Sequence, residues 1–209
     1  MNAALTPQAP PQHADLRTWV AVLASLLGAF MAVLDIAITN SSLKEILGAL
    51  SATQEEGSWI SSSYLVAEIV VIPLAGFLSA VFSTRRYLIV NVLLFLVSST
   101  LCGMAWSLES MIAFRALQGF TGGVMIPMAM TLVTRKLPVA KRPLGLALFG
   151  MTATLAPTLG PTFGGWLTDL YGWPSIFYIN WVPGLLLVAG VSWGLDREPM
   201  NLDLLRRVD

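Results

Sequence analysis

Residues 18–40 read TWVAVLASLLGAFMAVLDIAITN, and the first 17 of them, from Thr18 to Leu34, carry no charge. About 20 mainly apolar residues are needed for a helix to cross the hydrocarbon core of a bilayer, so this stretch can span one. Five further runs of 22 to 28 residues follow, interrupted only by Glu68 and Arg115. The sequence therefore predicts six membrane-spanning helices, at residues 18–40, 59–82, 87–107, 111–134, 144–167 and 175–195.

The composition of the chain points to the same class of protein. Of its 209 residues, 56% are hydrophobic and 11% are charged, whereas soluble domains carry about 25% charged residues. The strands of a transmembrane barrel are about 10 residues long and alternate in polarity, which these long apolar runs do not. A single Cys and a single His exclude an intrachain disulfide framework and a His-rich metal site. We expect an all-α polytopic membrane protein, a bundle of six transmembrane helices with no metal and no cofactor.

Lys and Arg are distributed unequally between the two sides of the predicted bundle. Ten of them lie on one side: in the N-terminal tail, in the loop between the second and third spans, in the loop between the fourth and fifth spans, and in the C-terminal tail. The opposite side has Lys44 alone. Because basic residues accumulate on the cytoplasmic side of a membrane, both termini are expected in the cytoplasm. The expected domains are a disordered cytoplasmic tail at 1–16, the bundle at 17–196, and a tail or the start of an inter-bundle connection at 197–209. The basic loops serve this topology, and we expect no nucleic-acid site.

Three ionisable side chains, Asp35, Glu68 and Arg115, lie inside predicted spans. A charge within the membrane costs at least ~2.5 kcal/mol on insertion scales, so it usually faces the bundle interior or a water-filled cavity. We interpret all three as candidates for proton coupling, and Asn40 and Gln118 as candidates for a substrate pathway. The alternatives are that Asp35 and Arg115 form a structural clasp and that Glu68 is a hydrogen-bonded packing residue.

The fifth predicted span is rich in glycine and proline. Spacing of four residues places Gly160 and Gly164 on one helix face, where another helix can approach closely. Pro157 and Pro161 each remove a backbone donor and favour a bend. Together with Gly165, these residues predict a closely packed, hinge-like helix.

Five short motifs follow one another along the chain. They are LDIAITN (residues 34–40), WISSSYL (59–65), RALQG (115–119), GPTFGG (160–165) and GWPSIFYINWVPG (172–184). This pattern is similar to the major facilitator superfamily, in particular to its EmrB/QacA branch of drug:proton antiporters. The resemblance covers residues 17 to 196.

The resemblance implies a bacterial inner-membrane transporter that exports lipophilic, often cationic, compounds in exchange for protons. It assigns proton coupling to Asp35 and Arg115, and its glycine-proline motif in the fifth span is associated with exporters. The cytoplasmic loop between the second and third spans fits the family at Gly76, Arg85 and Arg86. It departs from the family at two positions, where Ala80 replaces an acidic residue and Ser83 replaces a glycine.

The length of the chain departs from the family more strongly. Members of this branch resemble two pseudo-repeated bundles with fourteen spans, so six spans correspond to the N-terminal bundle. We expect a fragment, a truncated product or half of an assembly, with a C-terminal bundle and a periplasmic adaptor protein as partners. The alternatives are a non-transporting membrane scaffold or binding half, and a proton-coupled importer. An enzyme is not expected, because no paired catalytic carboxylates, metal motif or Ser/Lys dyad is present.

The topology can be tested by labelling single cysteines placed at Thr53 and Lys141 in a variant that lacks Cys102. We expect a membrane-impermeant thiol reagent added from outside to label position 53 and not position 141. Labelling of position 141 from outside would contradict the assigned orientation.

Overall fold

The computed structural model describes residues 15–201 and residue 204, so residues 1–14 of the predicted tail and Arg206 and Arg207 lie outside the described part. Every regular element in that part is helical. The helices are α1 (Leu16–Ser41), α2 (Leu43–Leu50), α3 (Gln54–Phe82), α4 (Thr84–Gly103), α5 (Leu108–Gly122), α6 (Met125–Lys136), the 3₁₀ turn η1 (Val139–Lys141), α7 (Arg142–Tyr171), α8 (Ser175–Tyr178) and α9 (Trp181–Gly194).

Six segments in the described part are long and apolar enough to cross a membrane, which confirms the predicted number. They are Leu16–Ser41, Gln54–Phe82, Thr84–Gly103, Leu108–Lys136, Val139–Tyr171 and Ser175–Gly194. The chain is therefore an all-helical, multi-pass membrane protein.

Two of the spans are interrupted, where the sequence predicted continuous helices. The fourth changes from α5 to α6 at Gly123, and the sixth changes from α8 to α9 at Asn180. A proline lies four residues after Gly123, at Pro127, and another four residues after Ile179, at Pro183. Proline cannot donate the hydrogen bond that would continue the helix at those points, which favours a break there. Proline alone does not decide it, because α3 continues through Pro73.

Helix α3 begins five residues before the predicted start at Trp59. Thr53 accepts a hydrogen bond from the Glu56 N–H, and the Glu56 carboxylate accepts one from the Thr53 N–H at 2.9 Å. This reciprocal capping box satisfies backbone donors at the start of the helix. Hydropathy alone therefore placed the start of the helix too late. The short helix α2, which buries Ile46 and Leu47, was also not predicted.

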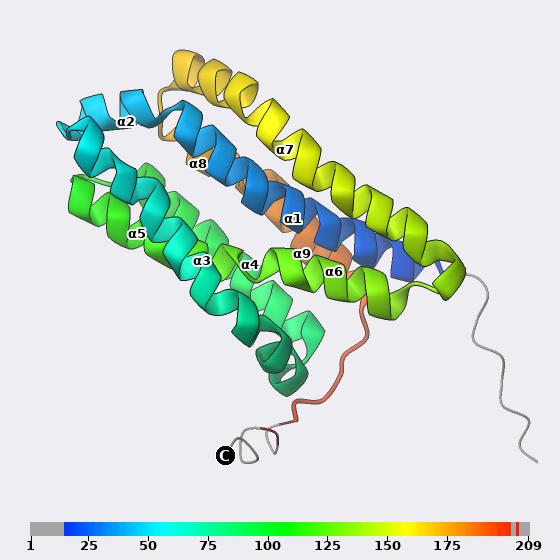
Figure 1. Cartoon of the computed structure of the whole chain (residues 1–209). Helices are drawn as coiled ribbons and strands as arrows, with labels where there is room; N and C mark the ends of the chain where they lie inside the picture. Colours follow the sequence, from blue (N-terminus) through cyan, green and yellow to red (C-terminus); the bar gives the residue numbers. More distant parts are fainter. Residues whose placement is uncertain (1–14, 202–203, 205–209) are drawn as a thin grey trace, which may run out of the picture.

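The spans form two sets around α1 and α5. Helix α1 packs mainly against α7, α9 and α6, while α5 packs against α3 and α4. Figure 1 shows α7 running beside α1 along most of its length, with α3 and α5 lying side by side in the other part of the bundle. Contacts of α4 with α9 and α8 join the two sets.

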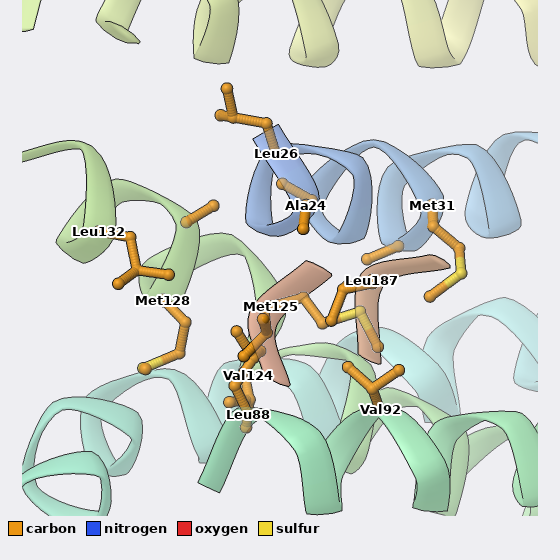
Figure 2. Close-up of a cluster of buried hydrophobic side chains, with 14 of the residues drawn as sticks. Ala24, Leu26, Met31, Leu88, Val92, Val124, Met125, Met128, Leu132 and Leu187 are labelled. Atoms are coloured by element: carbon orange, nitrogen blue, oxygen red, sulfur yellow. The ribbon is translucent and has the colours of Figure 1, made fainter. Parts of the chain in front are cut away.

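The buried apolar side chains form two clusters at different levels of the bundle. The larger includes Ala32 of α1, Leu96 of α4 and Val124, and Figure 2 shows part of it, with Met125, Leu187 and Val92 converging. The smaller includes Ile38, Cys102 and Met111. Along α1, α4 and α5 the buried residues between the two clusters are polar or glycine, and several of the polar ones form the site described below.

Glycines allow the helices to approach closely at several points in the described part, and two of these joints are near the polar residues between the clusters. A methyl group built on Gly119 of α5 would overlap the backbone of Tyr64 in α3. One built on Gly160 of α7 would overlap Ala37 of α1, and one on Gly164 would overlap Ser41 and come within 3.1 Å of the Ile38 carbonyl oxygen. Without a hydrophobic driving force between helices in lipid, such packing is a main source of helix association.

The predicted packing face of α7 needs one correction. No atom lies within 4 Å of a methyl group built on Gly165, so Gly165 does not take part in the contact with α1. Gly165 directly follows Gly164 and therefore points about 100° away around the helix. Pro157 and Pro161 lie on the exposed face, and α7 continues through both without interruption.

The joint between α7 and α1 can be tested with a matched pair of substitutions. Gly164→Leu places a side chain against the backbone of α1, and overpacking of this kind typically costs about 1–3 kcal/mol. Gly165→Leu adds the same side chain where there is space. We expect the first variant to unfold at lower temperature than the second in detergent micelles, measured by circular dichroism. Equal unfolding temperatures would contradict the close approach at Gly164.

Candidate functional site

A buried ion pair joins α1 to α5. One terminal nitrogen of Arg115, Nη1, lies 2.5 Å from Oδ2 of Asp35. Arg115 is completely buried and Asp35 is 2% exposed. Neither charge reaches solvent, so the pair depends on protein groups to replace water.

Three more polar side chains complete the surroundings of the carboxylate. Gln118 of α5 donates to Asp35 Oδ1 at 2.9 Å, and Asn180 donates to the same oxygen at 2.8 Å. The hydroxyl of Ser99 in α4 accepts from Gln118 at 3.1 Å and from Asn180 at 2.9 Å, and it donates to the Phe177 carbonyl oxygen at 2.8 Å. Four spans thus contribute side chains to one hydrogen-bond network around this carboxylate. We call Asp35, Arg115, Gln118, Ser99 and Asn180 the polar network.

The guanidinium of Arg115 is held by further contacts. Its Nη1 donates to Gln118 Oε1 at 2.7 Å, and its Nε donates to the Ile60 carbonyl oxygen at 3.4 Å. Its central carbon lies 4.3 Å from the ring centre of Tyr64 and 5.9 Å from that of Phe177. Arginine over an aromatic face is attracted by the ring quadrupole, more strongly when desolvated. The side chain therefore has little freedom to leave the carboxylate.

Two buried polar atoms beside the ion pair have no hydrogen-bond partner within the described residues. They are Nη2 of Arg115 and the hydroxyl oxygen of Tyr64. Buried polar atoms are nearly always paired in folded proteins, so each such exception calls for an explanation. These two atoms, on Arg115 itself and on the tyrosine packed against it, provide hydrogen-bonding capacity that the described residues do not use.

Local chain geometry places Asn180 in the network. The residue lies at the break between α8 and α9, where its N–H bonds the Phe177 carbonyl at 3.4 Å in a tightened turn. The sequence alone did not predict a role for Asn180 or Ser99. The signal that could have identified them is uncharged hydrogen-bonding side chains inside otherwise apolar spans, which usually mark contacts between helices.

Glu68 is buried, at 7% exposed, but lies outside the polar network. It makes no hydrogen bond or ion pair with any described residue. It packs instead beside the break between α5 and α6, where a methyl group built on Gly123 would come within 2.9 Å of Glu68 Cγ. The structure therefore shows no hydrogen-bonded packing role for this carboxyl group.

The remaining predicted site residues lie apart from the network. Asn40 is exposed at the end of α1, where its Oδ1 accepts a hydrogen bond from Ser61. Gly76 lies on the open side of α3, with no atom within 4 Å of a methyl group built on it. Arg85 and Arg86 are in the first turn of α4, at the other end of the bundle. Of the two predicted pathway residues, only Gln118 joins Asp35.

The sequence model of the Major Facilitator Superfamily matches residues 25–206. The chain belongs to this superfamily. A colistin resistance protein, EmrB, of Acinetobacter baumannii is 43% identical over 191 residues, which is 91% of this chain and 37% of that protein. A multidrug export protein, EmrB, of Haemophilus influenzae is 43% identical over 171 residues, which is 82% of this chain and 33% of that protein.

This superfamily member spans about a third of the length of these curated relatives. The crystal structure of a bacterial homologue of the human lysosomal transporter Spinster matches with a TM-score of 0.74 at 17% identity, covering 90% of this chain and 45% of that one. That likeness concerns the fold. The resemblance to the EmrB-type branch is confirmed by the two relatives, both of which carry the names of resistance or export proteins rather than of enzymes.

The energetic weight of the ion pair can be tested by removing one charge. In Asp35→Asn the Arg115 charge stays buried without a counter-ion, and breaking a buried pair in this way typically costs about 3–5 kcal/mol. The exposed pair of Lys136 and Glu198, 3.5 Å apart, provides the control, since Glu198→Gln should cost at most about 1 kcal/mol. Thermal unfolding of the purified variants in detergent measures both.

A double variant, Asp35→Asn with Arg115→Gln, separates charge from packing. Because it removes both buried charges, it should recover part of the stability that Asp35→Asn loses. If Asp35→Asn were as stable as Glu198→Gln, the buried pair would contribute no more to the free energy of unfolding than the exposed pair does.

Proposed function

We propose that this chain forms the N-terminal bundle of a proton-coupled exporter of lipophilic compounds, in which Asp35 binds and releases the proton. The observation that supports the proposal most directly is the burial of Asp35 and Arg115 at the meeting point of four spans. Ionisable residues inside a membrane bundle are costly and commonly mark ion pathways. The named functions of the EmrB relatives support export rather than another use of the site.

The network provides a means by which a proton can change the contacts between helices. A proton on Asp35 removes the negative charge of the carboxylate, to which Arg115, Gln118 and Asn180 donate hydrogen bonds. Arg115 then lacks its counter-ion and is drawn toward other acceptors or toward water, while Asp35 can donate one hydrogen bond instead of only accepting. Because Asp35 connects α1 with α5 and with the α8–α9 break, protonation weakens contacts between these spans. When these spans separate, water gains access to the site.

Two further residues have proposed roles in this exchange. Glu68 is the second candidate for proton binding, since the residue is only 7% exposed and its carboxyl group forms no ion pair with a described residue. Gln118 connects Asp35 to Ser99 and accepts from Arg115, so it is placed to respond when the proton arrives. Asn40, exposed at the end of α1, is proposed to lie along the substrate pathway.

The glycine joint between α1 and α7 is proposed to act as the hinge of the exporter. Gly160 and Gly164 permit the backbones to approach, and the hydroxyl of Ser42 contacts the Gly164 carbonyl at 3.3 Å and Thr168 at 2.8 Å. The buried residues of α7 are small apart from Leu167: they are Gly145, Ala156, Gly160 and Gly164. Sliding or tilting of α7 along α1 therefore meets little steric resistance.

The proposed setting is the bacterial inner membrane, with both termini in the cytoplasm. A substrate site between two bundles is the usual arrangement for transporters built from repeats. A C-terminal bundle and a periplasmic adaptor protein are accordingly proposed as partners. The domains proposed are the tail at 1–16, the bundle at 17–196 and the connection at 197–209.

The proposal can be tested in a chimera in which this chain replaces the matching segment of the Acinetobacter baumannii relative. Inside-out membrane vesicles with an imposed pH gradient would be given ethidium as a lipophilic cation, and proton movement would be followed with acridine orange. We expect ethidium to drive proton release from the vesicles. Asp35→Asn should reduce this release to that of vesicles without the protein, whereas Asp169→Asn, which changes an exposed carboxylate, should leave it intact.

Each other outcome has a distinct meaning. Release that persists in Asp35→Asn would refute the role of Asp35. A chimera present at normal amounts that moves no protons would favour a non-transporting scaffold. Proton and ethidium movement in the same direction would favour an importer.

A further inference from the structure

A basic hollow lies on the surface where α3 ends and α4 begins. It has a volume of about 260 Å³ and is lined by Arg85, Arg86 and Arg197. Arg85 is half-buried, and the other two side chains are exposed. This end of the bundle is far from the polar network along α3 and α4, and the proposed proton exchange does not use it.

Tertiary contacts bring the third arginine to this position. After α9 the chain crosses to the end of α3, where the N–H of Asn201 donates to the Val81 carbonyl at 2.8 Å. Glu198 forms an ion pair with Lys136 at the end of α6, 3.5 Å away. These two contacts hold Arg197, more than 100 residues away in sequence, beside Arg85 and Arg86. The hollow is therefore part of the fold and not only a run of neighbouring charges.

No carboxylate of the described residues forms an ion pair with the arginines of the hollow. The nearby Glu198 is engaged by Lys136. Position 80, in the last turn of α3, is an alanine. Three guanidinium groups that face one hollow without a counter-ion repel each other and favour a bound anion.

The start of α4 adds a second, independent feature. Ser83 precedes the helix with a φ of 71°, and its side chain forms no capping hydrogen bond. Its hydroxyl oxygen is buried and has no hydrogen-bond partner in the described part of the chain, while the residue as a whole is 3% exposed. The first N–H groups of a helix are unpaired and carry partial positive charge, so the N-terminus of α4 also favours an anion.

We propose that this hollow binds the phosphate group of an anionic phospholipid headgroup. Arginine suits phosphate because its planar fork donates two parallel hydrogen bonds to two oxygens. The hollow lies at the end of two membrane spans, at the level where headgroups are found, and basic hollows at the cytoplasmic ends of spans typically bind such lipids. Bound there, the phosphate links the α3–α4 turn to the segment that follows α9. Free inorganic phosphate offers the same chemistry, and the experiment distinguishes the two sources.

The test measures lipid retention by native mass spectrometry on the purified 209-residue chain in neutral detergent. Phosphatidylglycerol, phosphatidylcholine or inorganic phosphate is titrated in separate samples. We expect the unmodified chain to retain phosphatidylglycerol in preference to the other two. Arg86→Gln with Arg197→Gln should weaken phosphatidylglycerol binding about 25-fold, since each basic side chain near an anionic lipid surface contributes roughly a factor of five. Arg85 is left unchanged because it is half-buried.

The control is Arg135→Gln with Lys141→Gln, which removes the same charge from exposed residues on the same side of the bundle. It should retain phosphatidylglycerol within about twofold of the unmodified chain. Circular dichroism and gel filtration are used to check that both double variants are folded. Equal losses in the two variants, or no loss in Arg86→Gln with Arg197→Gln, would overturn the proposal. Binding of inorganic phosphate without phosphatidylglycerol would overturn the assignment to a lipid.

Discussion

The buried ion pair of Asp35 and Arg115 is the interaction on which the arrangement of the bundle depends. Moving two charges out of water costs several kcal/mol for each ion, and attraction between them offsets this only if the remaining hydrogen-bonding groups are also satisfied. Gln118, Asn180 and the Ile60 carbonyl satisfy most of these groups here, and Nη2 of Arg115 is the one left without a partner among the described residues. Each comes from a different part of the bundle, so the pair is stable only when four spans are correctly placed.

The glycine joints make this placement possible. Gly119 brings α3 against α5, so that the ring of Tyr64 and the Ile60 carbonyl reach Arg115. Gly160 and Gly164 bring α7 against α1, just beyond Asp35. In lipid, helices gain little from burying apolar surface against each other, so close packing and interhelical hydrogen bonds carry the association. The two kinds of interaction therefore support each other in this fold.

The polar network lies between two apolar clusters, and this position has a physical consequence. The clusters exclude water above and below the charges, which strengthens electrostatic interactions within the site. A proton that reaches Asp35 therefore has a larger effect on the helices than it would at a surface. The arginine hollow at the end of α3 lies in the opposite setting, open to the surface, where basic side chains attract anions without a desolvation cost of this size.

The sequence by itself determined the six spans, the helical fold class and the ionisable residues inside the membrane, because length and hydropathy are local properties of a segment. It also placed Gly160 and Gly164 on one face, since helical spacing alone decides that. It missed the early start of α3 at a capping box and the breaks at Gly123 and Asn180, where backbone hydrogen bonding outweighs hydropathy. Only the tertiary structure decided that Asn180 donates to both Asp35 and Ser99, that Gly165 faces away from α1 and that Arg197 joins Arg85. Those contacts join residues distant in sequence, and their formation depends on how whole helices pack, which no local pattern encodes.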